Sequence, residues 1–218
     1  MRFFINIIII VCLFSLVNAC KKDSGNNILV QGKIMDANQQ IAIANAEVTF
    51  WSSRIQSGTY NPNYVALTST TSDANGNYSL EITKAKDAGF RITVDKAKYF
   101  SLTNDISVEN LTVGTHNLNY TIYPEAYFKL HVKNVSFIDN TDYISYWFTN
   151  TQPNGTNCCN NIPINYTGQY YENNVLCRTF GAQDIKIKWI VKKAGITTPF
   201  ETTVYCAPFD TTVYNLNY

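Results

Sequence analysis

Apolar and polar residues alternate with a period of two over much of the chain, which is the pattern of half-buried β-strands. Residues 28–36 show it first, with Val30 and Ile34 on one face and Gln31 and Lys33 on the other. Further strands are expected at residues 47–51, 64–71, 77–82, 90–95, 101–108 and 116–123, with a polar loop at 52–63. No apolar stripe at helical spacing persists for three turns in this part of the chain, so we expect strands and turns only.

The clearest turn signal lies between residues 72 and 77, where Asp73, Asn75 and Gly76 occur together. An Asn-Gly pair suits the positive backbone dihedrals of a two-residue hairpin turn. We therefore expect residues 64–72 to pair antiparallel with residues 77–82.

Pro124 marks a boundary, because proline cannot donate a ladder hydrogen bond and restricts the preceding residue to extended geometry. Beyond it, residues 127–133 alternate cleanly, with Phe128 and Leu130 on one face and Lys129 on the other. Strands are also expected at residues 143–149, 175–180, 185–191, 197–205 and 211–216, with a hairpin turn at 193–195.

The first twenty residues follow a different pattern. Arg2 is the only charged residue there, and a mostly apolar run follows it and ends at Ala19-Cys20. A charged start, a short apolar run and a small residue before the cut predict a signal peptide at residues 1–19, since a spanning helix needs about 20 apolar residues.

The end of this segment resembles the lipobox of bacterial lipoproteins, which implies that Cys20 becomes the N-terminus and carries diacylglycerol. Residues 20–27 resemble the start of Bacteroidetes lipoproteins and have the polar composition of a tether. Because two or three acyl chains hold a protein at a membrane stably, we expect an exported protein whose membrane partner is reached through lipid. The expected location is the outer membrane, on its periplasmic or cell-surface face.

Three segments, at residues 30–36, 43–48 and 70–78, together resemble the carboxypeptidase regulatory-like, or transthyretin-like, sandwich. The resemblance covers about the first hundred residues after the tether and places Gly32 where the first strand leads to a turn. It implies a structural or accessory module without catalytic residues.

Pattern and resemblance together predict an all-β fold: two tandem immunoglobulin/transthyretin-like β-sandwiches after a cleaved lipoprotein signal peptide. The first, carboxypeptidase regulatory-like sandwich is expected at residues 28–123, and the second, which contains four cysteines, at residues 124–218. The roughly 200 residues of the mature chain suffice for two domains of about 100 residues each.

Charge and motif content give no indication of a nucleic-acid partner or of a cofactor. Without Arg2, the 17 Lys and Arg residues fall to 16, equal to the 16 Asp and Glu residues. A neutral chain has no basic footprint for nucleic acid, and no nucleotide or metalloprotease motif occurs. We therefore expect no cofactor and no nucleic-acid partner.

Four cysteines remain after Cys12 and Cys20 are set aside: Cys158, Cys159, Cys177 and Cys206. An even number in an oxidising compartment suggests disulfides, and we expect Cys177 to bond to Cys206. The competing pairings join Cys158 or Cys159 to each of these two. Zinc is the alternative, although the adjacent cysteines are awkward ligands of one tetrahedron.

Other metal-site candidates have simpler explanations. His116 and His131, the only histidines, lack partners at ligand spacing and are expected to be solvated, so no metal site is assigned. The Asp-rich segments at 73–77 and 139–142 could offer oxygens to calcium, but turns use the same residues for backbone reasons.

Aromatic residues cluster in two predicted loop regions: Trp51, Tyr60 and Tyr64 in the first half, and Tyr166, Tyr170 and Tyr171 in the second. Exposed rings of this kind can stack on sugars, whereas packing on a sheet explains tyrosines in a β-rich chain equally well.

The function that these observations favour is a non-enzymatic, membrane-tethered structural or protein-interaction lipoprotein of the bacterial envelope. The alternative is a polysaccharide-binding accessory lipoprotein that uses the loop aromatics. A hydrolase with paired carboxylates on an open loop comes third.

Overall fold

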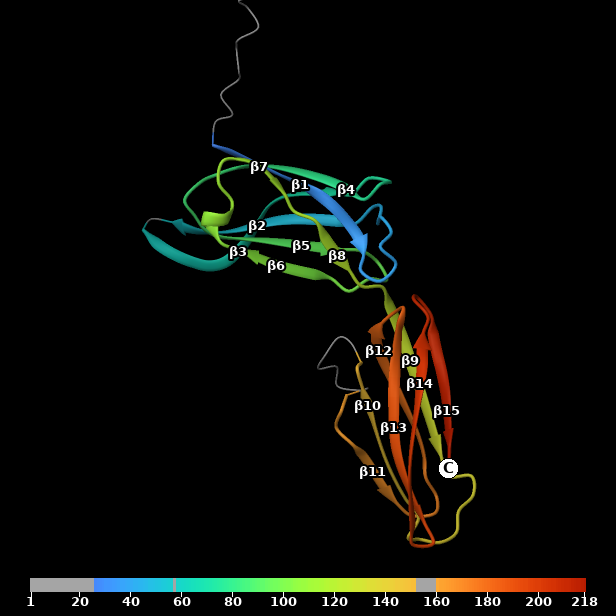
Figure 1. Ribbon diagram of the computed structural model, residues 1–218. Coiled ribbons are helices and arrows are strands. Elements are labelled where there is room, and N and C mark those ends of the chain that lie inside the picture. The colour runs from blue at the N-terminus through green and yellow to red at the C-terminus, as the bar shows by residue number, and fades with distance from the viewer. Residues whose placement is uncertain (1–25, 57, 152–159) are drawn as a thin grey trace, which may run out of the picture.

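The computed structural model describes residues 26–56, 58–151 and 160–218, and they form two β-sandwiches one after the other along the chain (Figure 1). This confirms the predicted all-β fold of tandem sandwiches. In the first sandwich the elements are β1 (Asn27–Asp36), β2 (Glu47–Gln56), β3 (Thr59–Thr71), β4 (Asn77–Thr83), β5 (Asp87–Asp95), β6 (Leu102–Ile106), the 3-10 turn η1 (Val108–Asn110), β7 (Gly114–Asn117) and β8 (Tyr120–Ile122). In the second they are β9 (Glu125–Lys133), β10 (Tyr143–Thr149), β11 (Ile164–Thr167), β12 (Glu172–Phe180), β13 (Gln183–Lys193), β14 (Ile196–Cys206) and β15 (Thr211–Asn217).

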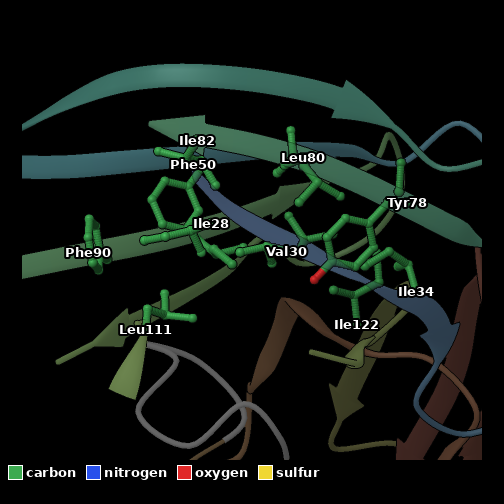
Figure 2. Packing of buried hydrophobic residues seen from close by; sticks show 14 of the residues in the cluster. Ile28, Val30, Ile34, Phe50, Tyr78, Leu80, Ile82, Phe90, Leu111 and Ile122 are labelled. Carbon is green, nitrogen blue, oxygen red and sulfur yellow. The ribbon is translucent and has the colours of Figure 1, made fainter. Parts of the chain in front are cut away.

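The first sandwich packs a sheet ordered β4-β1-β7, with β8 also paired to β1, against a sheet ordered β3-β2-β5-β6. All pairings are antiparallel except those of β1 with β7 and β8. The alternating residues of β1 and β4 supply one side of the core, and Phe50 and Phe90 supply the other (Figure 2). Each such side chain contributes about 1.5–3 kcal/mol when fully buried.

Gly32 lies in the middle of β1 and not at the end of the strand, where the family resemblance had placed it. A Cβ atom there would come within 1.9 Å of the Leu118 carbonyl oxygen. Leu118 lies between β7 and β8, and its N–H donates to the Gln31 carbonyl at 2.8 Å. The glycine is therefore required for the close approach of these two backbones.

The expected hairpin at Asn75-Gly76 is wrong. β4 pairs with β1, and β3 pairs with β2, so the two strands that flank the turn belong to different sheets. Only Gly76 of the pair has a positive φ, of +79°, whereas a type I′ turn requires a positive φ at both central residues. The turn is a corner between sheets, because burial of Tyr78 and Leu80 in the core brings β4 to β1.

Other strand boundaries also differ from expectation. The polar segment at 52–63 is not a loop, because β2 continues to Gln56 and β3 begins at Thr59. β11 has no counterpart among the expected strands, since its four residues are exposed or half-buried and do not alternate. The hairpin turn at 193–195 is confirmed, with positive φ at Ala194 and Gly195.

The second sandwich packs a sheet ordered β11-β10-β13-β14 against a sheet ordered β12-β9-β15. Phe128 and Leu130 of β9 face Ile144 and Tyr146 of β10 in its core, all at 0% exposure. β15 runs parallel to β9, and every other pairing in this sandwich is antiparallel.

The expected bond between Cys177 and Cys206 is wrong. Cys206 is a buried free thiol, whereas Cys177 is disulfide-bonded. The topology explains why these two do not meet: β12 is one edge of its sheet, and β14 packs beside β15, the opposite edge. Cys158 and Cys159, the other candidates, lie outside the described residues.

The signal peptide, Cys20 and most of the expected tether also lie outside the described residues. Within the part that the structure describes, no helix is long and apolar enough to cross a membrane.

Candidate functional site

The aromatic residues singled out in the first sandwich separate into two places. Trp51 and Tyr64 line one hollow of about 240 Å³ together with Asn63, Arg91, Thr93 and Thr103, and we call this site the Trp51 hollow. Tyr60 is not among its lining residues and is 57% exposed near the β2–β3 turn.

The Trp51 hollow lies on the outer face of the sheet β3-β2-β5-β6. Its residues on β5, Arg91 and Thr93, alternate with Ile92 and Val94, which are fully buried in the core. Trp51 is likewise adjacent to the buried Phe50. The period of two along each strand therefore directs the lining side chains away from the core.

An irregularity in the pairing of β2 with β3 positions Tyr64. The register shifts between Ser52 and Arg54, so that the segment holding Tyr64 has extra residues opposite β2. Bulges of this kind redirect side chains. The Tyr64 hydroxyl reaches Gly89, where an added Cβ atom would lie 3.0 Å from that oxygen. Gly89 thus leaves room for the ring on the sheet.

Arg91 connects the aromatic and polar parts of the hollow. Its guanidinium carbon lies 4.1 Å from the centroid of the Tyr64 ring. Nε and Nη2 donate to the two carboxylate oxygens of Asp105 at 2.5 and 2.9 Å. The hydrogen bond to Asp105 raises the pKa of Arg91, and the same bond lowers the pKa of Asp105. Both groups therefore stay ionised, and their charges cancel locally.

Trp51 is held by one hydrogen bond, since its indole N–H donates to the Thr93 hydroxyl at 3.0 Å. The indole is half-buried. The site thus offers an oriented aromatic face beside a planar donor–acceptor pair, which is suited to a flat ligand with hydroxyl groups.

The aromatic residues singled out in the second sandwich do not form such a platform. The rings of Tyr166 and Tyr171 stack at 4.2 Å and pack against the core. The hydroxyls of Tyr171 and Tyr146 are 3.1 Å apart, and burial raises the pKa of Tyr146. Tyr170 is 73% exposed and contacts Phe137 instead. Tyr166 and Tyr171 are therefore half-buried residues that pack against the core.

Trp147 is a surface aromatic residue that was not among the candidates expected from the sequence. It lies on β10 between the buried Tyr146 and Phe148 and lines an outer-face hollow of about 410 Å³ with Lys188, Pro199 and Glu201 among others. The alternation of residues in β10 could have predicted its exposure, because it places Trp147 on the face opposite the core residues.

The titratable groups first considered as metal ligands lie apart from one another. Across residues 26–56, 58–151 and 160–218, no three His, Cys, Asp or Glu side chains gather where they could hold a metal ion. His131 contacts Glu172 at 2.7 Å, and His116 contacts the Thr112 carbonyl at 2.8 Å. Asp73 accepts hydrogen bonds from the backbone N–H groups of Asn75 and Asn77, which makes it a turn residue.

The junction between the sandwiches is a further feature that the sequence analysis did not predict, and it has no sequence signal. We call it the aromatic junction. It comprises Tyr99, Phe100 and Tyr123 from the first sandwich and Phe180 and Phe209 from the second. The ring centroids of Tyr123 and Phe180 are 4.0 Å apart and nearly parallel, those of Phe100 and Phe180 are 4.8 Å apart, and those of Tyr99 and Phe209 are 5.2 Å apart.

Polar contacts frame the aromatic junction. Asn38 Nδ2 donates to the Gly181 carbonyl at 2.6 Å, and the Glu125 N–H donates to the Lys98 carbonyl at 2.8 Å. The Arg178 guanidinium lies 4.1 Å from the Phe100 ring centroid and forms an ion pair with Glu125. Burial, followed by the charge and hydrogen bond of Asp36, raises the pKa of Tyr99 to about 12.

Comparison with known proteins gives no family. No family model matches the chain, and no curated protein does either.

Solved structures share β architecture at low similarity. The shaft pilin SpaA from Lactobacillus rhamnosus GG is 7% identical, with a TM-score of 0.32 over 88% of this chain and 96% of that one. A streptococcal ancillary pilin is 10% identical, with a TM-score of 0.34 over 88% of this chain. The 3-chlorocatechol 1,2-dioxygenase from Rhodococcus opacus 1CP is 15% identical, with a TM-score of 0.34 over 47% of this chain.

This chain spans 61% of the dioxygenase and 62% of the ancillary pilin. With TM-scores this low, the similarities carry no argument about function.

Proposed function

We propose that the chain is a non-enzymatic lipoprotein module of a bacterial envelope, tethered through Cys20, whose two sandwiches act as one stiff structural unit that meets a protein partner. The aromatic junction is the observation that carries this proposal. An enzyme needs a site in which reacting groups converge, whereas a structural module needs domains that keep a fixed orientation relative to each other.

The connection between the sandwiches is very short, because β8 ends at Ile122 and β9 begins at Glu125. Only Tyr123 and Pro124 lie between them, and proline restricts its own φ as well as the preceding residue. Ring pairs contribute about 0.5–1.5 kcal/mol each beyond their buried area. Three ring pairs and the surrounding hydrogen bonds therefore oppose bending at this point.

The lipid anchor rests on the sequence. The lipobox-like ending at Ala19-Cys20 and the polar residues that follow supply an anchor and a spacer before β1. The carboxypeptidase regulatory-like pattern in the first sandwich fits an accessory role in the same compartment. The location that follows is the outer membrane, with the sandwiches on its periplasmic or cell-surface side.

Replacement of Cys20 by Ala tests the anchored function in cells. Because acyl chains supply the membrane affinity, C20A should lose palmitate incorporation and leave the membrane fraction. Cys206→Ala is the matched control, since this cysteine is buried in the second sandwich, and C206A should keep both properties. Unchanged labelling and detergent partitioning of C20A would contradict the lipoprotein assignment.

A further inference from the structure

We propose that the Trp51 hollow binds one sugar ring of a neutral polysaccharide, which gives the chain a ligand beyond its structural role. The proposal rests on the outer face of the β3-β2-β5-β6 sheet and does not depend on the lipid anchor or the aromatic junction.

The aromatic part of the hollow is already oriented. The hydrogen bond from its N–H to Thr93 fixes the indole of Trp51, and Tyr64 is held between the Arg91 guanidinium and Gly89. Rings held in place lose little conformational freedom when a ligand binds, so more of the contact energy appears as affinity. The C–H faces of a pyranose can stack on such rings.

The polar part of the hollow is centred on Arg91, and the adjacent Asp105 adds acceptor oxygens beside its donors. Arg91 still has N–H groups outside its two bonds to Asp105, and the Asp105 side chain is 57% exposed. A planar pair of this kind can bond two neighbouring hydroxyls of a sugar. The hydroxyls of Thr93 and Thr103 and the amide of Asn63 line the same hollow.

The charge balance selects a neutral sugar. Arg91 is the one lining residue with a charged side chain, and Asp105, which pairs with it beside the hollow, compensates that charge. A carboxylate or sulfate on the ligand would approach Asp105 and meet like charge, which is unfavourable.

The size of the hollow selects one ring. Its volume of about 240 Å³ is below the roughly 300–1,000 Å³ of sites that enclose a drug-sized ligand. The outer sheet face around it lets the rest of a polymer chain extend across the strands. We therefore expect weak binding per site and a preference for polymers, in which many rings raise the local concentration.

Affinity electrophoresis of the full mature chain in mild detergent tests the proposal, with gels that contain laminarin, yeast mannan, hydroxyethylcellulose or polygalacturonate. At least one neutral polymer should retard the protein. W51A should weaken that retardation roughly tenfold to thirtyfold, as for an aromatic anchor that the bound ligand covers. W147A is the matched control, because Trp147 also lies half-buried on an outer sheet face, but in the second sandwich, and it should behave as wild type.

A second variant tests the proposal if W51A does not fold. Asp105 is largely exposed on the edge strand β6, so D105N should fold and still weaken retardation severalfold. The W147F/W189F double variant keeps Trp51 as its only tryptophan, and its fluorescence should change when the neutral polymer is added.

Absence of retardation by any neutral polymer overturns the proposal, as does equal retardation of wild type and W51A. Retardation by polygalacturonate alone overturns the neutral class.

Discussion

Gly76 is the position where a substitution should show most clearly that the turn joins two sheets. The residue has a φ of +79°, and a Cβ atom would lie 2.5 Å from the Ile34 carbonyl oxygen and 3.2 Å from the Ala42 side chain. Its own carbonyl accepts the Ile34 N–H at 2.8 Å. Gly76→Val therefore strains the backbone and also forces β1 and the turn apart.

The two costs can be separated with Gly58. Gly58 has a φ of +78°, yet nothing lies within 4 Å of an added Cβ atom. A side chain at positive φ costs about 1–3 kcal/mol in either variant. The steric overlap, which only G76V has, adds about 1–3 kcal/mol, the usual cost of overpacking. For a domain of this size the addition corresponds to about 5–20 °C in thermal midpoint.

G76V and G58V are each combined with W147F/W189F, which leaves Trp51 as the only tryptophan. Its fluorescence then reports thermal unfolding of the first sandwich. The midpoint of G76V should lie about 5–20 °C below that of G58V. Equal midpoints for the two variants would mean that the overlap with Ile34 has no energetic consequence, contrary to this prediction.

Two further predictions concern the second sandwich. Burial opposes ionisation of Asp142, but hydrogen bonds from Asn134 and the Ile138 N–H outweigh it and lower its pKa. The stability that Asp142 contributes is therefore present above the unfolded pKa of about 4 and is lost as the pH falls through the lowered value. In urea unfolding, Asp142→Asn should lose less stability below pH 4 than the wild type does. The same loss of stability in acid for both proteins would contradict this prediction. Burial and, to a smaller extent, the charge of Asp184 raise the pKa of Cys206 to about 11. The thiol therefore ionises at lower pH in the unfolded chain than in the folded one. The free energy of unfolding should fall as the pH rises from about 9 to 11. Cys206→Ala should flatten that fall, and Cys206 should react with iodoacetamide only after unfolding; rapid labelling of the native chain would contradict its burial.

The strands were predictable where one face is buried. β9 alternates because its apolar residues enter the core while its polar residues stay exposed or half-buried, and the strands expected at β9 and β10 match the observed ones closely. Strand partners were less predictable. The Asn75-Gly76 pair has the local sequence of a hairpin turn, but the backbone of β4 pairs with β1. Burial of Tyr78 and Leu80 in the core decides that β4 pairs with β1 and not with β3.

The candidate site was predictable in part. The sequence pointed to Trp51 and Tyr64, but Arg91 and Asp105 join them only through strand pairing across β2, β5 and β6. For Tyr166 and Tyr171 the sequence left two uses open, sugar stacking and packing on a sheet, and in the structure they pack against the core. Tyrosine has an apolar body and a polar end, so sequence alone does not separate these two uses.

If the two sandwiches form one stiff unit, the distance between them has a narrow distribution, which can be measured. Spin labels at the exposed positions Glu81 and Lys129 report this distance by double electron–electron resonance on the mature chain. We expect one narrow distribution for the labelled chain and a broader one with Phe180→Ala at the aromatic junction. Phe137→Ala, at an exposed aromatic residue outside the junction, should cause no change. A broad distribution before any junction substitution would show that the two sandwiches move independently and that the stiff unit does not exist.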